Sequence, residues 1–415
     1  MSGRRLFLKN GVRTMLAGTA CLLRPGSIFG SAVPNEVDIT VEAGAYDRVG
    51  TPVFMVLPES LRATPNFALT QADTNGVIAA QVESGDPPRL VWIVDRLKAG
   101  QVRHYRLAGL QGKTAPLPAV VTENDGKLLS VKIAGKTVLQ YNEAAVPSPI
   151  PNKPEYRRSG YLHPIFDPLG RPITDDMAPD HAHQHGVMFA YEKTQFEGSS
   201  LNFWEPSNGT ISHERTLPTV SGSVFGGFQV LLSHNENDLP SGQRHVLRET
   251  WNVRVFNLKD YFLFDLISVQ NCAGDQPLLI EKNSYGGLAL RCHRNWFDPR
   301  NSEYLTSEGK TRENGNQTRP RWVDLAGSID GKISGVTVMG HPENFRFPQP
   351  VRLHPAKPYF CFAPMAVDAF SIVPGTPFLS RYRFYVHRGK PDTAKTEMIW
   401  RDYAEPPQVT LRVAS

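Results

Sequence analysis

The amino-acid sequence predicts an all-β protein, with a small N-terminal β-sandwich followed by a large β-sandwich. Short apolar runs with a period of two recur along the chain, and no useful window of helical periodicity separates the first of them. Gly and Pro, with 34 residues each, make turns dense and disfavour long helices. The length of 415 residues is enough for two or three units with a sizeable core.

The first 32 residues have the features of an export signal. Arg4 and Arg5 precede a short apolar stretch, and small residues follow at 30–32. This pattern predicts a twin-arginine signal peptide over residues 1–32, the twin-arginine export machinery as a partner, and a periplasmic or secreted protein. The apolar stretch contains Arg13 and falls short of the roughly 20 residues of a stable membrane span. Lipidation of Cys21, or an N-terminal helix that belongs to the fold, are the alternatives.

The charge of the chain is concentrated in this segment. The 45 basic and 40 acidic residues give a net charge of +5, and residues 1–32 contain five basic residues and no acidic one. The rest of the chain is therefore neutral overall, and nucleic acid is not expected as a partner. The motifs of nucleotide-binding loops, zincins and α/β-hydrolases are absent.

Residues 33–148 are predicted to form the small sandwich. Its expected strands lie at 37–41, 52–57, 89–94, 128–133 and 137–141, and the last two form a hairpin through a turn at 134–136. Four prolines between 147 and 154 then predict a stiff linker or crossing segment.

Residues 149–415 are predicted to form the large sandwich. Its expected strands lie at 187–191, 224–232, 245–256, 261–270, 286–292, 335–339 and 381–387. Polar and apolar residues alternate over 248–255, as expected for a strand with one face exposed to solvent. Cys272, Cys292 and Cys361 have no CxxC spacing, so we expect buried thiols rather than a disulfide framework.

Histidines are concentrated in the second unit, above all in the segment DHAHQHG at 180–186. On an extended chain, His181, His183 and His185 would project from one face, at steps of about 7 Å. Two of them, His181 and His183, could bind one divalent metal ion, or the set could form a polar floor for a sugar. Metal binding and acid/base catalysis both remain open. Asp180 precedes the set, and Glu281 in the segment EKNSYGGLALR supplies a second carboxylate.

A composite pocket would need further residues that hold substrate oxygens. A Gly-Gly pair beside Tyr285 allows a ligand to approach a strand closely. The predicted substrate-binding residues are His163, His185, Trp204, Tyr285, Arg291, Trp322, His341 and Arg346, and His354 is a further candidate for the pocket.

The order of these segments resembles a known family. The runs YLHPIFDPLGRPITDDMAPDHAHQHGVMFAY, YGGLALR, RWVDLAGSIDGKISGVTVMGHPENFRFPQP and RYRFYVH, over roughly residues 125–405, resemble the "methane oxygenase PmoA-like" family of exported bacterial proteins. The family motif resembles DHPHHRG, so Asp180, His181 and His183 carry over, whereas Ala182, Gln184 and His185 depart from it. The resemblance implies a galactose-mutarotase-like supersandwich, a fold that commonly serves epimerases, lyases and glycosidases.

These observations predict an exported carbohydrate-active enzyme. It would act on a sugar or glycoside by acid/base or metal-assisted chemistry, through β-elimination, hydrolysis or epimerisation. His181, His183, Asp180 and Glu281 are the predicted catalytic residues. The alternatives are a non-catalytic carbohydrate-binding protein, with Trp204, Trp296 and Trp322 as stacking platforms, and a copper or iron redox protein built on the histidine cluster.

Overall fold

The computed structural model describes residues 36–62, 66–109 and 117–413. The predicted signal peptide at 1–32, with Cys21, lies outside these residues. Within the described ranges, no helix has both the length and the apolar character needed to cross a bilayer.

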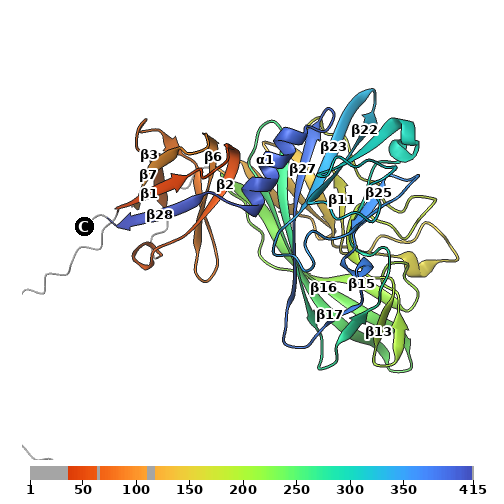
Figure 1. Ribbon diagram of the computed structural model, residues 1–415. Helices are drawn as coiled ribbons and strands as arrows, with labels where there is room; N and C mark the ends of the chain where they lie inside the picture. Colours follow the sequence, from red (N-terminus) through yellow and green to blue (C-terminus); the bar gives the residue numbers. More distant parts are fainter. Residues whose placement is uncertain (1–35, 63–65, 110–116, 414–415) are drawn as a thin grey trace, which may run out of the picture.

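A small β-sandwich is built from strands near both ends of the described chain (Figure 1). Its five-stranded sheet has the order β28 (Gln408–Val413), β1 (Glu36–Glu42), β7 (Val102–Gly109), β3 (Phe67–Gln71), β4 (Val77–Ile78). Its three-stranded sheet has the order β2 (Arg48–Val56), β6 (Arg89–Leu97), β5 (Ala80–Glu83), and the short 3-10 helix η1 spans Glu59–Leu61. Alternate residues of β1 are buried, so one face of each sheet closes the core.

The large sandwich contains two eight-stranded sheets. The first has the order β24 (Val351–Leu353), β25 (Tyr359–Phe362), β20 (Gly287–Arg291), β12 (Val187–Ala190), β11 (Leu162–Ile165), β10 (Lys136–Asn142), β9 (Leu128–Ile133), β8 (Val120–Asn124). The second has the order β15 (Gly209–Thr216), β16 (Phe225–Leu239), β17 (Gly242–Phe256), β18 (Phe262–Cys272), β27 (Phe378–Arg388), β23 (Lys332–Gly340), β22 (Trp322–Ile329), β21 (Ser302–Thr306).

Smaller elements complete the large unit. A four-stranded sheet has the order β14 (Ser199–Leu201), β13 (Thr194–Phe196), β19 (Leu278–Ile280), β26 (Phe370–Ile372). The helices are η2 (Pro154–Tyr156), η3 (Arg294–Phe297), η4 (Pro299–Asn301), η5 (Pro364–Ala366) and α1 (Thr393–Ala404). Asp392 caps α1 by accepting a hydrogen bond from Lys395 N at 3.1 Å.

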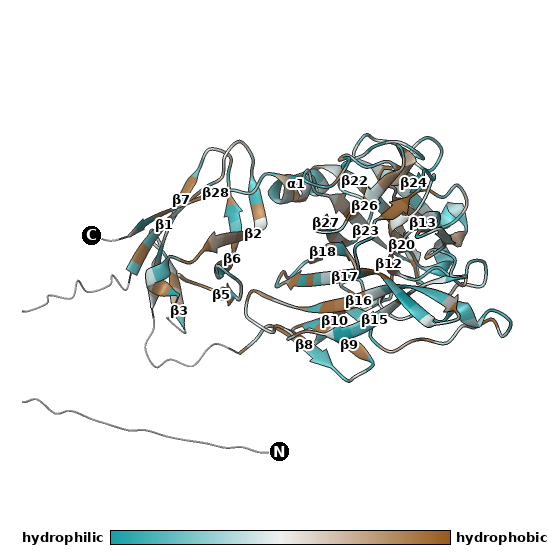
Figure 2. Ribbon diagram, turned by 90° about the horizontal axis from the view of Figure 1, so that it is seen from below, coloured by the Kyte–Doolittle hydropathy of each residue, from teal (hydrophilic) through white to brown (hydrophobic). Residues whose placement is uncertain are grey.

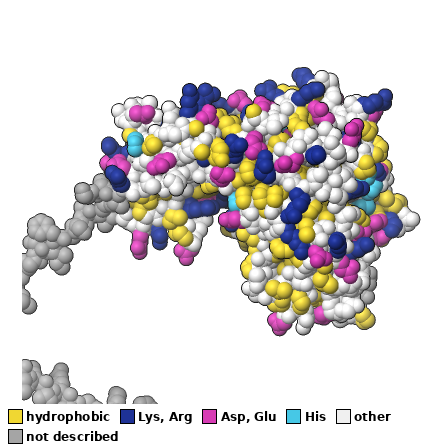
Figure 3. Space-filling model, viewed as in Figure 1, with side chains coloured by type: hydrophobic (Ala, Val, Ile, Leu, Met, Phe, Trp, Pro, Cys, Tyr) yellow, Lys and Arg dark blue, Asp and Glu magenta, His cyan; other side chains and the backbone are white. Residues whose placement is uncertain are grey.

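One continuous hydrophobic core lies between the two eight-stranded sheets. Strands β12 and β20 are buried along their whole length and mostly hydrophobic (Figure 2), as expected for strands in the middle of a sheet that is covered on both faces. A separate cluster joins the small sandwich to the large one, where Val91 of β6 packs with Phe256, Leu263 and Trp400. Basic and acidic side chains are mixed on the face shown in Figure 3.

The predicted fold class is confirmed: a small all-β sandwich precedes a large two-sheet sandwich. The boundary predicted at residue 148 is wrong, because the hairpin β9–β10 pairs with β8 and β11 inside the large sheet. The proline-rich segment therefore connects two strands of one sheet. Strand β28 pairs with β1 and returns the end of the chain to the small sandwich. Cys292 and Cys361 are buried, Cys272 is half-buried, and all three are free thiols.

Candidate functional site

The histidine-rich segment forms tight turns between β11 and β12. His181 N donates to Ala178 O at 2.9 Å, and Gln184 N donates to His181 O at 2.9 Å. The expectation of an extended segment with three histidines on one face is therefore wrong. The turns instead direct His181 and His183 to a cavity, whereas His185 packs in the interior.

This cavity has a volume of about 210 Å³ and lies where the turns meet the edge of the first eight-stranded sheet. The loop after β14, the segment before β20 and the β24–β25 hairpin supply its other walls. The residues that line it are His181, His183, Gln184, Trp204, Glu205, Tyr285, Arg352, His354 and Tyr359.

His181 forms a compact group with Asp180 and Lys357. Its Nδ1 lies 2.9 Å from Asp180 Oδ2 and 2.9 Å from Lys357 Nζ, while Nζ lies 3.0 Å from the same carboxylate oxygen. The other Asp180 oxygen accepts from the buried Arg291 at 2.7 Å. Burial favours the neutral acid, but the hydrogen bond from Lys357 and the charge of Arg291 outweigh it and hold the pKa of Asp180 below its usual range. Asp180 is thus ionised, and His181 Nε2 has no hydrogen-bond partner among the described residues.

His183 and Glu205 form one end of the cavity. The rings of His181 and His183 have centroids 5.4 Å apart, and Tyr156 lies edge-on to His183 at 5.6 Å. Burial lowers the pKa of His183 to about 4, although Glu205 acts in the opposite direction, so its ring is neutral near pH 7. Tyr156 Oη donates to Glu205 Oε1 at 2.5 Å, and this hydrogen bond lowers the pKa of Glu205. This end therefore presents a carboxylate.

Arg352 and His354 form another part of the wall. His354 Nδ1 accepts from Ala356 N at 3.1 Å and from Lys357 N at 3.0 Å, so its Nε2 carries the proton. Burial, together with the charges of Arg352 and Lys357, lowers the pKa of His354 to about 4. In the described parts of the chain, no acid or hydrogen-bond acceptor contacts the half-buried Arg352 guanidinium.

Aromatic side chains form the remaining wall. The Trp204 ring centroid lies 5.6 Å from that of Tyr285 and 5.8 Å from that of Tyr359. Burial raises the pKa of both tyrosines, so they present neutral hydroxyls. The wall thus combines an apolar surface with hydrogen-bonding groups.

Several residues predicted for the composite pocket lie elsewhere. His185 is 1% exposed, and its Nδ1 lies 2.6 Å from Asp176 Oδ1 behind the turns. Trp322 is 1% exposed in the cluster between the two sandwiches. Glu281 accepts a hydrogen bond from Gln195 at 2.9 Å, in a strand pairing of the four-stranded sheet.

His341 and Arg346 also lie outside the cavity. His341 packs against Tyr403 next to α1, with ring centroids 4.9 Å apart. Arg346 donates to Pro364 O at 2.9 Å and to Ala369 O at 3.1 Å, so it ties two loops together. These two residues share a sequence segment with Trp322, but β22 and β23 carry that segment to another part of the large sandwich.

His163 lines a different groove, of about 680 Å³, with Asp175, His293 and Arg294. Its Nδ1 lies 2.9 Å from Thr174 Oγ1, and burial lowers its pKa. Two arginines near the end of β20 serve different sites: Arg291 of β20 pairs with Asp180 beside the cavity, whereas Arg294 of η3 pairs with Asp175 at 2.6 Å in the groove.

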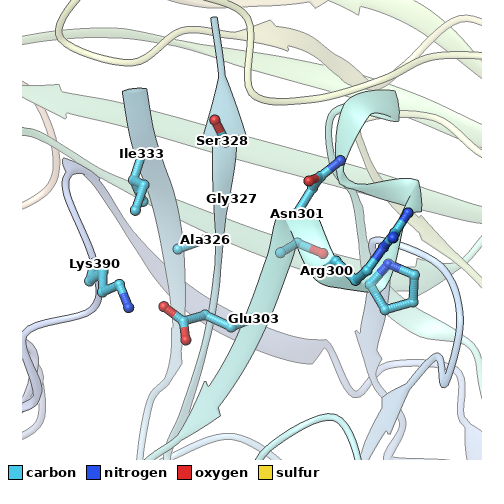
Figure 4. A pocket seen from close by; sticks show the side chains of 10 residues that line it. Arg300, Asn301, Glu303, Ala326, Gly327, Ser328, Ile333 and Lys390 are labelled. Carbon is cyan, nitrogen blue, oxygen red and sulfur yellow. The ribbon is translucent and has the colours of Figure 1, made fainter. Parts of the chain in front are cut away.

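A pocket of about 390 Å³ lies at the edge strands β21 and β22 (Figure 4). Glu303 and Lys390 lie on one side of it in this view, and Arg300 on the other. Arg300 is paired with Asp298 at 2.6 Å. None of the residues predicted from the sequence lines this pocket, and its lining contains no histidine to exchange protons near neutral pH.

The residues at the cavity do not fit the predicted metal ion. In the described ranges, no group of three or more His, Cys, Asp or Glu side chains is arranged to hold one. The Lys357 ammonium lies beside His181 Nδ1, where it would repel a cation. The chemistry proposed for the cavity therefore relies on its side chains.

Four cavity residues were absent from the sequence prediction: Gln184, Glu205, Arg352 and Tyr359. Gln184 lies between the predicted His183 and His185, and Glu205 directly follows the predicted Trp204, so adjacency was the available signal for both. The other two lie on a hairpin whose position against the histidine turns depends on the pairing of β20 with β25. That pairing joins segments about 70 residues apart and leaves no local pattern.

Comparisons with known proteins place the chain in a family. No curated protein matches it. A solved structure described as a protein in the glycosyl hydrolase family 38 from Enterococcus faecalis is similar, with a TM-score of 0.38 and 11% identity. That match covers 92% of this chain and 48% of the other, so the chain spans about half the length of that protein. The family model described as a family of unknown function, DUF6807, matches residues 128–401. Because this match covers more than half of the sequence, the chain belongs to the DUF6807 family.

Proposed function

We propose that this protein is an exported carbohydrate-active enzyme that acts on a sugar or glycoside by acid/base catalysis, with His181 as the acid/base group. The observation that carries this proposal is the contact of His181 with Asp180 and Lys357 at the wall of a cavity. The Asp180 carboxylate and the Lys357 ammonium at Nδ1 orient the imidazole, and Nε2 remains available to substrate. The relationship to the PmoA-like family and export by the twin-arginine route are predictions from the sequence.

The lining of the cavity supports a sugar ring as the ligand. Its volume of about 210 Å³ is below the roughly 300–1,000 Å³ of pockets for drug-sized ligands, so it suits one small unit. Trp204 supplies an apolar surface, and Glu205, Tyr285 and His354 supply acceptors and donors around it. A sugar ring has the same combination of apolar C–H faces and hydroxyls at its rim.

Among the proposed reactions, the lining favours proton abstraction from carbon. Hydrolysis by the common route uses two carboxyl groups that flank the glycosidic bond. In the described lining, Glu205 is the one carboxylate, and Asp180 is held by Lys357 and Arg291. In β-elimination the base takes a proton from carbon, the electron pair forms a double bond, and the neighbouring C–O bond breaks as the departing oxygen gains a proton. In epimerisation, a proton returns to the opposite face of the same carbon.

The experiment is a screen of neutral glycosides and uronides for product formation, followed by variants. His181→Asn and His183→Ala should each lower turnover by at least about 100-fold while the protein stays folded, because general acid/base groups contribute factors of about 10²–10⁴. His104→Ala is the matched control, since His104 lies on the small sandwich and, of the residues that the structure describes, only Thr40 lies within hydrogen-bond distance of its ring. Unchanged turnover in both cavity variants would refute the assignment.

The carbohydrate-binding alternative loses two of its three stacking platforms. Trp296 and Trp322 are buried, and neither lines the cavity. Trp204 is 3% exposed, but it is the one tryptophan of the three that lines the cavity. A single tryptophan beside a potential base supports an enzyme better than a binding module.

A further inference from the structure

We propose that the ligand of this cavity carries a carboxylate, as in a uronic acid unit, and that Arg352 binds that carboxylate. This inference deepens the proposed function and rests on it for the sugar part of the ligand. The carboxylate itself is inferred from the cationic side of the cavity.

Arg352 has no counterion among the residues that the structure describes. Neighbouring arginines have partners: Arg291 pairs with Asp180 at 2.7 Å, Arg294 pairs with Asp175 at 2.6 Å, and Arg312 lies over the Tyr304 ring at 4.5 Å. Arg352 is half-buried, and within the described residues its guanidinium contacts no acid, acceptor or aromatic face. A partly desolvated cation without a counterion gains most from an anionic ligand.

His354 adds a second donor beside this cation. Backbone N–H groups of Ala356 and Lys357 occupy its Nδ1, which leaves the proton on Nε2. The planar fork of a guanidinium matches the two oxygens of a carboxylate, and a neighbouring imidazole N–H adds a further hydrogen bond.

The distribution of charge also fixes the direction of the ligand. His181 lies between the two ends, with its ring centroid 5.4 Å from that of His183 and 6.4 Å from that of His354. Glu205 lies at the His183 end and would repel a second negative charge, but it can accept hydrogen bonds from hydroxyls. A sugar with one carboxylate fits this arrangement, with its charge toward Arg352 and its hydroxyls toward Glu205.

Calorimetric titration of the full-length protein tests the proposal. The probes are the methyl glycosides of glucuronate, galacturonate and mannuronate, their methyl esters, the matching neutral glycosides, and glucose 6-sulfate. At least one uronide should bind about tenfold or more tightly than its ester and its neutral partner, because hydrogen bonds to charged groups are worth about that factor. Arg352→Met should remove this preference, and Arg352→Lys should keep part of it.

The control is Arg300→Met, since the side chain of Arg300 is 89% exposed and pairs with Asp298 in its own turn. This variant should bind like the wild type. Equal affinity for acid and ester, equal affinity for glucose 6-sulfate, no binding of any uronide, or full binding by Arg352→Met would each overturn the proposal. Arg352 has no partner to lose among the described residues, so we expect its variants to fold, and a melting curve verifies this.

The same titrations distinguish this inference from the proposed function. If uronides bind through Arg352 but no product forms with wild-type protein, acid/base catalysis fails and the carboxylate site stands. If product forms from neutral sugars at equal rates in wild type and Arg352→Met, catalysis stands and the carboxylate site is overturned.

Discussion

At the scale of single residues, the surroundings of each histidine decide whether it can do chemistry. Histidines lie within hydrogen-bond distance of carboxylates at several places: His181 with Asp180, His185 with Asp176, His234 with Glu249 and His387 with Asp324. The last three histidines are at most 3% exposed, whereas His181 lines a cavity. Only His181 among these four therefore combines an orienting carboxylate with access to a ligand.

The buried pair of His387 and Asp324 gives a pH-dependent stability. His387 Nε2 lies 2.9 Å from Asp324 Oδ2, and although burial favours the neutral imidazole, the charge of Asp324 outweighs it and raises the pKa of His387. The stabilisation is thus complete below the unfolded-state pKa of about 6.5 and is lost as the pH rises through the higher folded-state value. Urea unfolding of the wild type should show this loss above about pH 6.5.

His387→Gln provides the comparison for that measurement. The variant should unfold more easily than the wild type at low pH, and the difference should shrink as the pH rises. A difference that stays constant or grows with pH would contradict the assigned direction of the pKa shift.

The sequence singles out the histidine segment, but it does not show which of its histidines line a cavity and which are buried. His181, His183 and His185 look equivalent when the segment is read as extended. The turn hydrogen bonds of His181 and Gln184 break that equivalence. Arg291 of β20 holds both ends of the turns, since its backbone bonds to Asp175 and Gly186, and no local pattern shows these contacts. Arg352 was missed because an arginine without a partner is recognisable only after all its neighbours are in place.

At the scale of elements, a close approach of two chain segments holds the histidine turns in place. A Cβ on Gly186 would lie 2.3 Å from Leu162 O and 3.1 Å from the Cβ of His163. Gly186 directly follows His185 and precedes β12, so the absence of a side chain lets β11 and β12 pair at the base of the turns.

Gly186→Ala should therefore lower both stability and ligand binding. We expect the free energy of unfolding to fall by about 2 kcal/mol, the usual cost of forcing extra atoms into a packed region. Gly274→Ala is the control, because a Cβ there meets nothing within 4 Å, and it should change stability by less than about 0.5 kcal/mol. Equal effects of the two variants in urea unfolding would show that this contact is not tight.

Local sequence patterns predicted where the strands lie better than they predicted which strands pair with one another. The alternation at 248–255 lies within β17, and the predicted hairpin at 128–141 matches β9 and β10. The assignment of that hairpin to the small sandwich failed because its apolar face suits either core. Helix α1 was not foreseen, since only Thr396, Ile399, Trp400 and Asp402 of its twelve residues are buried.

At the scale of the whole molecule, the two sandwiches are joined by α1. Arg48 on β2 donates to Asp402 Oδ1 on α1 at 2.9 Å and to Glu405 O at 2.8 Å, and Thr51 donates to Asp402 Oδ2 at 2.6 Å. Both charged side chains of the pair are 3% exposed. The strand β28 follows α1 and pairs with β1, so α1 leads the chain from the large sandwich back to the small one (Figure 1).

Arg48→Met should destabilise the junction by about 3 kcal/mol or more, because it leaves the Asp402 carboxylate buried without its cation. Arg48→Met combined with Asp402→Leu should recover part of that loss, since an apolar pair of similar size avoids the unpaired charge. Thermal melts of the two variants and the wild type measure this. A double variant less stable than the single one would contradict the argument.

The central claim is that one cavity, with His181 in its wall and Arg352 at its cationic side, binds the substrate. A crystal structure of the protein with the tightest-binding methyl uronide tests this most directly. We expect the sugar ring to lie against Trp204, with its carboxylate within hydrogen-bond distance of Arg352 and a ring carbon near His181 Nε2. A uronide bound instead in the groove at His163 or the pocket at Arg300, with this cavity empty, would contradict it.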